Sequence, residues 1–105
     1  MDIERSTMQL IMHGGTARSK AMEAIASAKE GKAAEARELL HEADAALAEA
    51  HRAQAELIQS EADGETVPIT LILVHAQDHL MNAITVKDLA TEFVDLYARL
   101  PKGGA

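Results

Sequence analysis

The sequence predicts an all-α fold, an up-down-up bundle of three antiparallel helices. Alanine, the residue with the highest helix propensity, supplies 21 of the 105 residues. Residues that favour strands are scarce, since the chain has one Tyr, one Phe and no Trp. Two breaks, at Gly31 and at residues 62–68, divide the chain into three helical segments. Short connections make neighbouring helices antiparallel, and we expect residues 1–105 to form one domain.

The first helix is expected over residues 2–30, where small and apolar residues recur at spacings of three and four. This seam consists of Thr7, Leu10, Gly14, Ala17, Ala21, Ala24 and Ala28. Gly14 and Gly15 interrupt the helix at a cost of roughly 1 kcal/mol each relative to alanine. We therefore expect either the close approach of another helix or a local kink at this point.

The second helix is expected over residues 32–62, with the same rhythm. Its seam consists of Ala36, Leu40, Ala43, Leu47, Ala50, Gln54 and Leu57. The third helix is expected over residues 68–100, with Thr66 as its cap. Pro68 is acceptable in a first turn, where its missing N–H costs little. Pro101 and the two glycines after it end this helix.

The start of the third helix is unusually apolar. Residues 69–74 read Ile-Thr-Leu-Ile-Leu-Val, which is apolar on nearly every side of a helix. A helix that is hydrophobic all round is buried all round, and three thin, alanine-rich helices cannot cover it alone. The sequence therefore predicts that this segment packs against other copies of the chain.

Composition excludes several classes of function. A net charge of -7 with ten Lys and Arg argues against nucleic acid and anionic membranes as partners, and favours a partner with a basic face. The chain has no cysteine, so it has no disulfides or thiolate metal sites. The sequence shows neither a signal peptide nor the apolar run of about 20 residues that a membrane-spanning helix needs, and we expect a cytoplasmic protein.

A polar stripe follows the apolar run. His75, Asp78, His79 and Asn82 are spaced to share one face of the helix. Polar groups on a buried helix are costly unless they have partners, so the stripe calls for explanation. The groups could be polar core or surface residues without a further role. Alternatively, His75, Asp78 and His79 could bind zinc or iron, although Glu38 and His41 give only one of the two Glu-x-x-His pairs of a di-iron bundle.

The third explanation is phosphoryl transfer. An imidazole with a pKa of roughly 6.5 has a free ring nitrogen at neutral pH, which can attack phosphorus and later act as a leaving group. The site needs an accessible ring, a hydrogen bond that orients it, and donors near the phosphoryl oxygens. We expect the Gln77 or His79 side chain to supply such donors beside His75.

Residues 73–84, LVHAQDHLMNAI, resemble the phosphorylation-site signature of the enzyme IIA components of the lactose/cellobiose (N,N'-diacetylchitobiose) family of the phosphoenolpyruvate-dependent sugar phosphotransferase system. The resemblance extends over nearly the whole chain. It includes HGGTARSKAMEAI (residues 13–25), AKEGKAAEARELLHEADAALAEAH (residues 28–51) and the LYARL string near the end. The sequence departs from the family pattern at Gly14-Gly15 and at Val67-Pro68.

The resemblance implies a phosphotransferase component with a phosphohistidine intermediate at His75. A homotrimer of three-helix subunits would receive the phosphoryl group from the phosphocarrier HPr. It would pass the group to a cysteine of the cognate IIB component during uptake of a lactose- or cellobiose/chitobiose-type disaccharide. The alternative is a non-catalytic, oligomeric helical module that binds a divalent metal.

The resemblance also implies that Asp78 meets its two symmetry mates around a divalent cation at the trimer axis. Three buried carboxylates at one axis repel each other unless they are protonated or bridged, and a hard cation such as Mg²⁺ would bridge them. No further cofactor is expected. The roles of His13 and His51 are left open, with packing or surface positions favoured for both. Arg18 and Lys20 are candidate cations near a phosphate.

Overall fold

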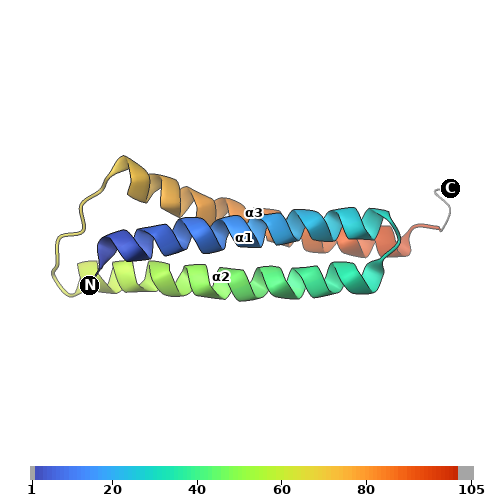
Figure 1. Cartoon of the computed structure of the whole chain (residues 1–105), viewed down its shortest axis with the longest axis horizontal. Helices are drawn as coiled ribbons and strands as arrows, with labels where there is room; N and C mark the ends of the chain where they lie inside the picture. The colour runs from blue at the N-terminus through green and yellow to red at the C-terminus, as the bar shows by residue number, and fades with distance from the viewer. Residues whose placement is uncertain (1, 102–105) are drawn as a thin grey trace.

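Three α-helices make up the computed structural model of the chain, which describes residues 2–101 (Figure 1). They are α1 (Ile3–Lys29), α2 (Ala33–Ala62) and α3 (Leu71–Arg99). The helices run up, down and up along a rod of 58 × 20 × 17 Å. The described residues contain no strand, so the predicted all-α, three-helix fold is confirmed. Within residues 2–101, no helix is both long and apolar enough to cross a membrane.

The turn between α1 and α2 is closed by a glycine in the left-handed region. Gly31 has a φ of 79° and its N–H donates to the carbonyl of Ala28 at 3.0 Å. The N–H of Lys32 donates to the carbonyl of Ser27 at 2.9 Å, so two carbonyls at the end of α1 have partners. The Ser27 hydroxyl also donates to the Glu35 carboxylate of α2 at 3.0 Å. These bonds fix the reversal of the chain that makes α2 antiparallel to α1.

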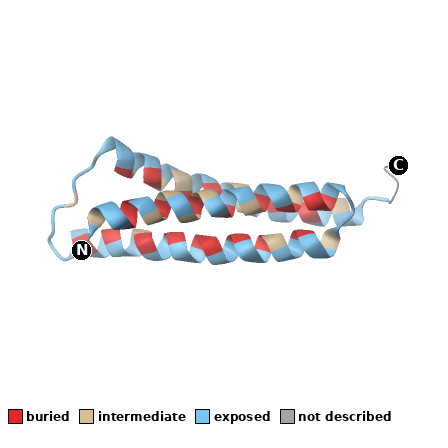
Figure 2. Cartoon of the chain, in the orientation of Figure 1, coloured by how far each residue is buried: buried red, intermediate tan, exposed pale blue. Residues whose placement is uncertain are grey.

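The predicted seams are the buried faces of the helices, drawn red in Figure 2. Every predicted seam residue of α1 is buried. Those of α2 are also buried, except that Gln54 is half-buried. The heptad interpretation of both segments is therefore confirmed. Leu10 and Leu80 are the largest fully buried side chains, while most other core positions hold alanine.

The start of α3 differs from the prediction. The helix begins at Leu71, and its N-cap is Thr70, whose Oγ1 accepts a hydrogen bond from the N–H of Leu73 at 3.1 Å. The predicted cap, Thr66, and Pro68 both lie outside the helix. The reason is tertiary, because Val67 packs against the core cluster and ties this segment to the bundle as a non-helical connection. At the other end, Pro101 follows the helix as predicted, whereas the two glycines expected to help end it lie outside the described residues.

The apolar run is largely uncovered in the single chain. The exposed fractions are 78% for Ile69, 86% for Leu71, and 53% for both Ile72 and Val74. Figure 1 shows why, since the first turns of α3 lie apart from the other two helices. Leu73 is the member of the run that is buried in the core. We call the four exposed residues the 69–74 patch. Three helices do not cover it, as the sequence predicted.

Removing the Thr70 hydroxyl should weaken the start of α3. We expect Thr70→Ala to lower the free energy of unfolding by about 1 kcal/mol, the usual value of an N-cap hydrogen bond. Urea denaturation followed by circular dichroism measures it. Thr66→Ala is the matched control, because the Thr66 side chain makes no hydrogen bond with the described residues, and it should change stability little. Equal effects of the two substitutions would contradict the assignment of the cap.

Candidate functional site

Two histidines one turn apart on α3 form the centre of the candidate site. Nε2 of His79 lies 3.0 Å from Nε2 of His75. The two rings are nearly perpendicular, with an interplanar angle of 88° and 4.5 Å between their centroids. One nitrogen donates its hydrogen to the other when both rings are neutral, so each ring orients its neighbour. We call these two residues the histidine pair.

The histidine pair lies at the border between covered and uncovered surface. His75 is exposed and His79 is half-buried. His75 and Asp78 line a hollow of about 700 Å³ together with three apolar residues: Leu71, Ile72 and Val74. The hollow therefore joins the predicted reactive ring, the predicted carboxylate and part of the 69–74 patch. A ring nitrogen of His75 is reachable by a partner molecule.

Gly14 of α1 sets how closely α1 approaches the histidine pair. A Cβ built on Gly14 would lie 3.2 Å from the backbone carbon and oxygen of His79, and 3.3 Å from its Cβ. Those contacts are tighter than ordinary van der Waals distances, so the missing side chain is what allows α1 to pack on α3 here. Of the two explanations for the double glycine, close helix approach is confirmed at Gly14. No described neighbour lies within 4 Å of a Cβ built on Gly15.

Gln77 is held by the second helix. Its Oε1 accepts a hydrogen bond from Nε2 of Gln54 on α2 at 2.8 Å. Two residues along a helix correspond to a turn of about 200°, so Gln77 and His75 point to different sides of α3. Within one chain, the structure therefore brings His79 to His75 and leaves Gln77 with α2. Asp78 and Asn82 are both exposed.

Among the described residues, the other cations and histidines singled out from the sequence form no hydrogen bond or ion pair with the histidine pair. Lys20 forms an ion pair with Glu42 of α2 at 3.7 Å. Arg18 is exposed and forms no ion pair with any described residue. His13 is half-buried on α1, next to Gly14, whereas His51 is exposed on α2.

The described residues of a single chain do not form a metal centre. In the part of the chain that the structure describes, no three His, Asp or Glu side chains lie together so that they could hold an ion. The interpretation of His75, Asp78 and His79 as a three-ligand zinc or iron site in one chain therefore has no support from the geometry. A carboxylate site shared between subunits would need one Asp78 from each copy.

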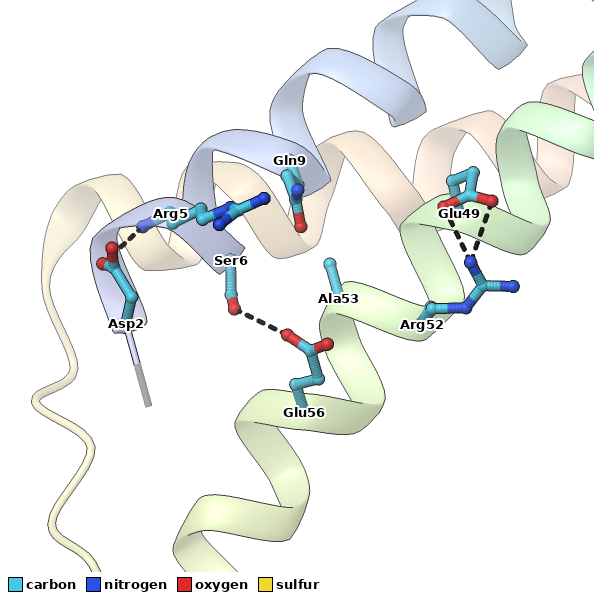
Figure 3. Close-up of a pocket in the computed structure, with 8 residues that line it drawn as sticks. All are labelled: Asp2, Arg5, Ser6, Gln9, Glu49, Arg52, Ala53 and Glu56. Atoms are coloured by element: carbon cyan, nitrogen blue, oxygen red, sulfur yellow. Dashed lines mark hydrogen bonds and ion pairs between the residues drawn. The ribbon is translucent and has the colours of Figure 1, made fainter.

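A second hollow, of about 550 Å³, lies between α1 and α2 (Figure 3). Figure 3 shows Arg52 bound to both carboxylate oxygens of Glu49 at 3.0 Å, and the Ser6 hydroxyl donating to Glu56 at 3.1 Å. None of the described residues that line it belongs to α3. This hollow is therefore separate from the histidine pair.

The motif around the histidine pair can be set against known families. The family model described as "PTS system, Lactose/Cellobiose specific IIA subunit" matches residues 5–98 of this chain. The chain belongs to this family. PTS is the sugar phosphotransferase system, so the resemblance drawn from residues 73–84 is confirmed, and this IIA chain is a phosphotransferase-system protein.

Individual relatives agree over nearly their whole length. The IIA chain is 56% identical over 99 residues to the lichenan-specific phosphotransferase enzyme IIA component of Bacillus subtilis (strain 168), covering 94% of this chain and 90% of that protein. The crystal structure of the PTS cellobiose-specific enzyme IIA from Bacillus anthracis superposes with a TM-score of 0.93 at 57% identity, covering 99% and 95%. The solution structure of the IIA(Chitobiose)–HPr complex of Escherichia coli gives a TM-score of 0.79 at 38% identity, covering 92% and 94%.

Two features of the IIA site were not predicted from the sequence. Gln54 was expected as a seam residue, and its bond to Gln77 was not foreseen. Gln54 is the one amide among apolar and small seam residues, and this was the feature of the sequence that could have indicated a polar partner. For Gly14 the sequence predicts either a close helix approach or a kink, and names no partner, because periodicity cannot say which residue of another helix lies opposite.

Adding a methyl group at Gly14 should strain the contact with His79. Overpacking usually costs about 1–3 kcal/mol, and alanine returns about 1 kcal/mol of helix propensity. We therefore expect Gly14→Ala to lower the free energy of unfolding, and the matched control Gly15→Ala to raise it by up to about 1 kcal/mol. Urea denaturation of both variants measures the difference. A Gly14→Ala variant as stable as Gly15→Ala would rule out the close contact.

Proposed function

We propose that this IIA chain is a cytoplasmic phosphocarrier that holds a phosphoryl group on His75. It accepts the group from phosphorylated HPr and passes it to a cysteine of a IIB component, during uptake of a lactose- or cellobiose/chitobiose-type disaccharide. One observation carries the proposal: His75 is exposed within the family motif, and its Nε2 lies 3.0 Å from Nε2 of His79. The related complex of IIA(Chitobiose) with HPr supports HPr as the donor.

The transfer needs two displacements at phosphorus. A lone pair of a His75 ring nitrogen attacks the phosphorus of the donor phosphohistidine, and the broken N–P bond returns its electron pair to the donor ring. The cysteine thiolate of IIB then attacks the same phosphorus, and the His75 nitrogen leaves with its electron pair. The Nε2–H of His79 is the donor placed to hydrogen-bond a phosphoryl oxygen, since it is already within 3.0 Å of the His75 ring.

We further propose that the IIA chain functions as a homotrimer. The 69–74 patch supports assembly, because Leu71 is 86% exposed and Ile72 and Val74 are 53% exposed in the single chain. Exposed apolar side chains grouped in one place are typical of surfaces that subunits cover. The patch adjoins His75 and Asp78 in the same hollow. Subunits that cover it would therefore meet beside the reactive ring.

Asp78 fits a divalent cation shared by the three subunits, which we propose to be Mg²⁺. Its carboxylate is exposed in one chain and lines the hollow with apolar side chains that assembly would bury. Burying three carboxylates together is unfavourable without a positive charge, and oxygen ligands are those that Mg²⁺ prefers. The cation would neutralise these carboxylates when bound. The phosphoryl chemistry remains with the histidine pair.

A non-catalytic helical module is the weaker alternative. Family membership over residues 5–98 and the paired imidazoles both favour a phosphocarrier.

Phosphorylation of His75 is testable by mass spectrometry. Incubation with phosphoenolpyruvate, enzyme I and HPr should add about 80 Da to the wild-type chain, in an acid-labile and base-stable form typical of phosphohistidine. His75→Gln should keep its circular dichroism spectrum and lose the label. His51→Gln is the matched control, because His51 is an exposed histidine on α2, and it should keep the label. A label that persists in His75→Gln would overturn the assignment.

Removing the Asp78 carboxylate should not dissolve the trimer. We expect Asp78→Leu to abolish Mg²⁺ binding at the axis and to leave the trimer intact or more stable, because apolar side chains often replace buried charges at no cost. Sedimentation with and without EDTA measures this. The wild-type trimer should weaken in EDTA, and the variant should not respond. Dissociation of Asp78→Leu to monomers would contradict the axial position of the carboxylate.

A further inference from the structure

We propose that the histidine pair is also a chelating site for one divalent transition-metal ion of the Zn²⁺ class. The ion would bind between the Nε2 atoms of His75 and His79. The part of the proposal that concerns inhibition rests on the proposed function, because the ion would occupy a nitrogen that phosphoryl transfer uses. The binding part stands on geometry alone.

The spacing and the distance both suit chelation. Two histidines at i and i+4 on one helix face are a known arrangement for binding one zinc ion. Two nitrogens bound to one ion at about 2.0–2.1 Å lie about 2.9–3.4 Å apart for angles between square and tetrahedral. The Nε2 atoms of the histidine pair are 3.0 Å apart before any ion binds. Rotation of the exposed His75 ring would turn its Nε2 lone pair toward an ion bound by Nε2 of His79.

The surroundings suit a cation and hold one of its ligands in place. His79 is half-buried, and α1 packs closely on its backbone at Gly14, so His79 is the fixed ligand and exposed His75 the adjustable one. Asp78 adds a negative charge to the hollow, and no Lys or Arg is among the described residues that line it. Binding would therefore require no displacement of a protein cation.

The two imidazole nitrogens determine which class of metal ion this site would bind. Zn²⁺, Cu²⁺ and Ni²⁺ bind imidazole well, whereas Mg²⁺ prefers oxygen ligands. The described residues offer no third His, Asp or Glu grouped with the pair, so water would fill the remaining positions, and the ion should be removable by a chelator. This site is thus distinct in chemistry from a carboxylate site at Asp78.

An ion on the pair excludes the phosphoryl group. Both Nε2 lone pairs point at the ion when it is bound, so each ring then carries its proton on Nδ1. His75 has no Nε2 lone pair left to attack phosphorus, and His79 has no Nε2–H left to donate to a phosphoryl oxygen. Zn²⁺ would therefore act as a reversible inhibitor of phosphorylation, and phosphorylated His75 would no longer chelate the ion.

Zn²⁺ binding is measured first, without phosphotransferase components. The full chain is titrated with Zn²⁺ by calorimetry in excess Mg²⁺, which keeps oxygen-ligand sites occupied. We expect one Zn²⁺ per chain, with an affinity at least about tenfold lower in His75→Gln and in His79→Gln, each of which breaks the chelate. His51→Gln, at an exposed histidine of α2, should bind like the wild type. Absence of binding, or an equal loss in His51→Gln, would overturn the site.

Inhibition is measured second, with purified phosphorylated HPr as the donor. Zn²⁺ should slow labelling of the wild type in proportion to occupancy, and EDTA should restore it. Residual labelling of His79→Gln should be insensitive to Zn²⁺, which separates an effect on the pair from an effect on HPr. If His79→Gln is slowed equally, the inhibition does not arise at the pair. If the chain is phosphorylated but does not bind Zn²⁺, the metal site is refuted and the proposed function stands. If the chain binds Zn²⁺ but cannot be phosphorylated, the metal site stands and the proposed function is refuted.

Discussion

The close packing of α1 on both α2 and α3 through very small side chains is the constraint on which the rest of the structure depends. Ala17, Ala21 and Ala24 of α1 are fully buried, and Gly14 continues the same face. Small residues let helix axes approach, but each buries little apolar area, and burial stabilises by only about 25 cal/mol per Å². A bundle built in this way is thin. Its small side chains cannot cover the outer face of α3.

The uncovered start of α3 follows from that thinness. The four residues of the 69–74 patch are more than half exposed, while the neighbouring Leu73 lies in the core. One face of α3 is therefore buried against its own chain, and another apolar face is left exposed. The histidine pair lies where the two faces meet, with His79 half-buried and His75 exposed. The proposed carrier role would need such a position, since a phosphorylated ring must be reachable by other proteins and yet be held in one orientation.

Gly14 connects the packing to the chemistry. The backbone of His79 lies 3.2 Å from where a side chain at Gly14 would begin, so the position of one imidazole is set by the fit of α1. The other imidazole is oriented by the first through the 3.0 Å contact. The same turn of α3 also carries Asp78, so the oxygen ligand proposed for Mg²⁺ and the nitrogen ligands proposed for Zn²⁺ are neighbours on one helix. Which metal each of them would bind depends on the chemistry of the side chain, oxygen or nitrogen, and not on a large distance between them.

Much of the fold and part of the candidate site could be predicted from the sequence, because the buried residues of a helix recur with the helical period. The seams of α1 and α2 recur every three or four residues, and the buried faces follow them. The i, i+4 spacing likewise placed His75 and His79 on one face, and residues 73–84 pointed to the family. The apolar run at residues 69–74 predicted a surface that one chain leaves uncovered.

Tertiary structure decided the features that depend on contacts between distant residues. Thr70 rather than Thr66 caps α3, because Val67 packs on the core and ties the connection down. Gln77 faces Gln54, 23 residues away, rather than His75. The residue opposite Gly14 proved to be His79. A pattern along one helix fixes which residues share a face, but only the packing of helices fixes what that face meets.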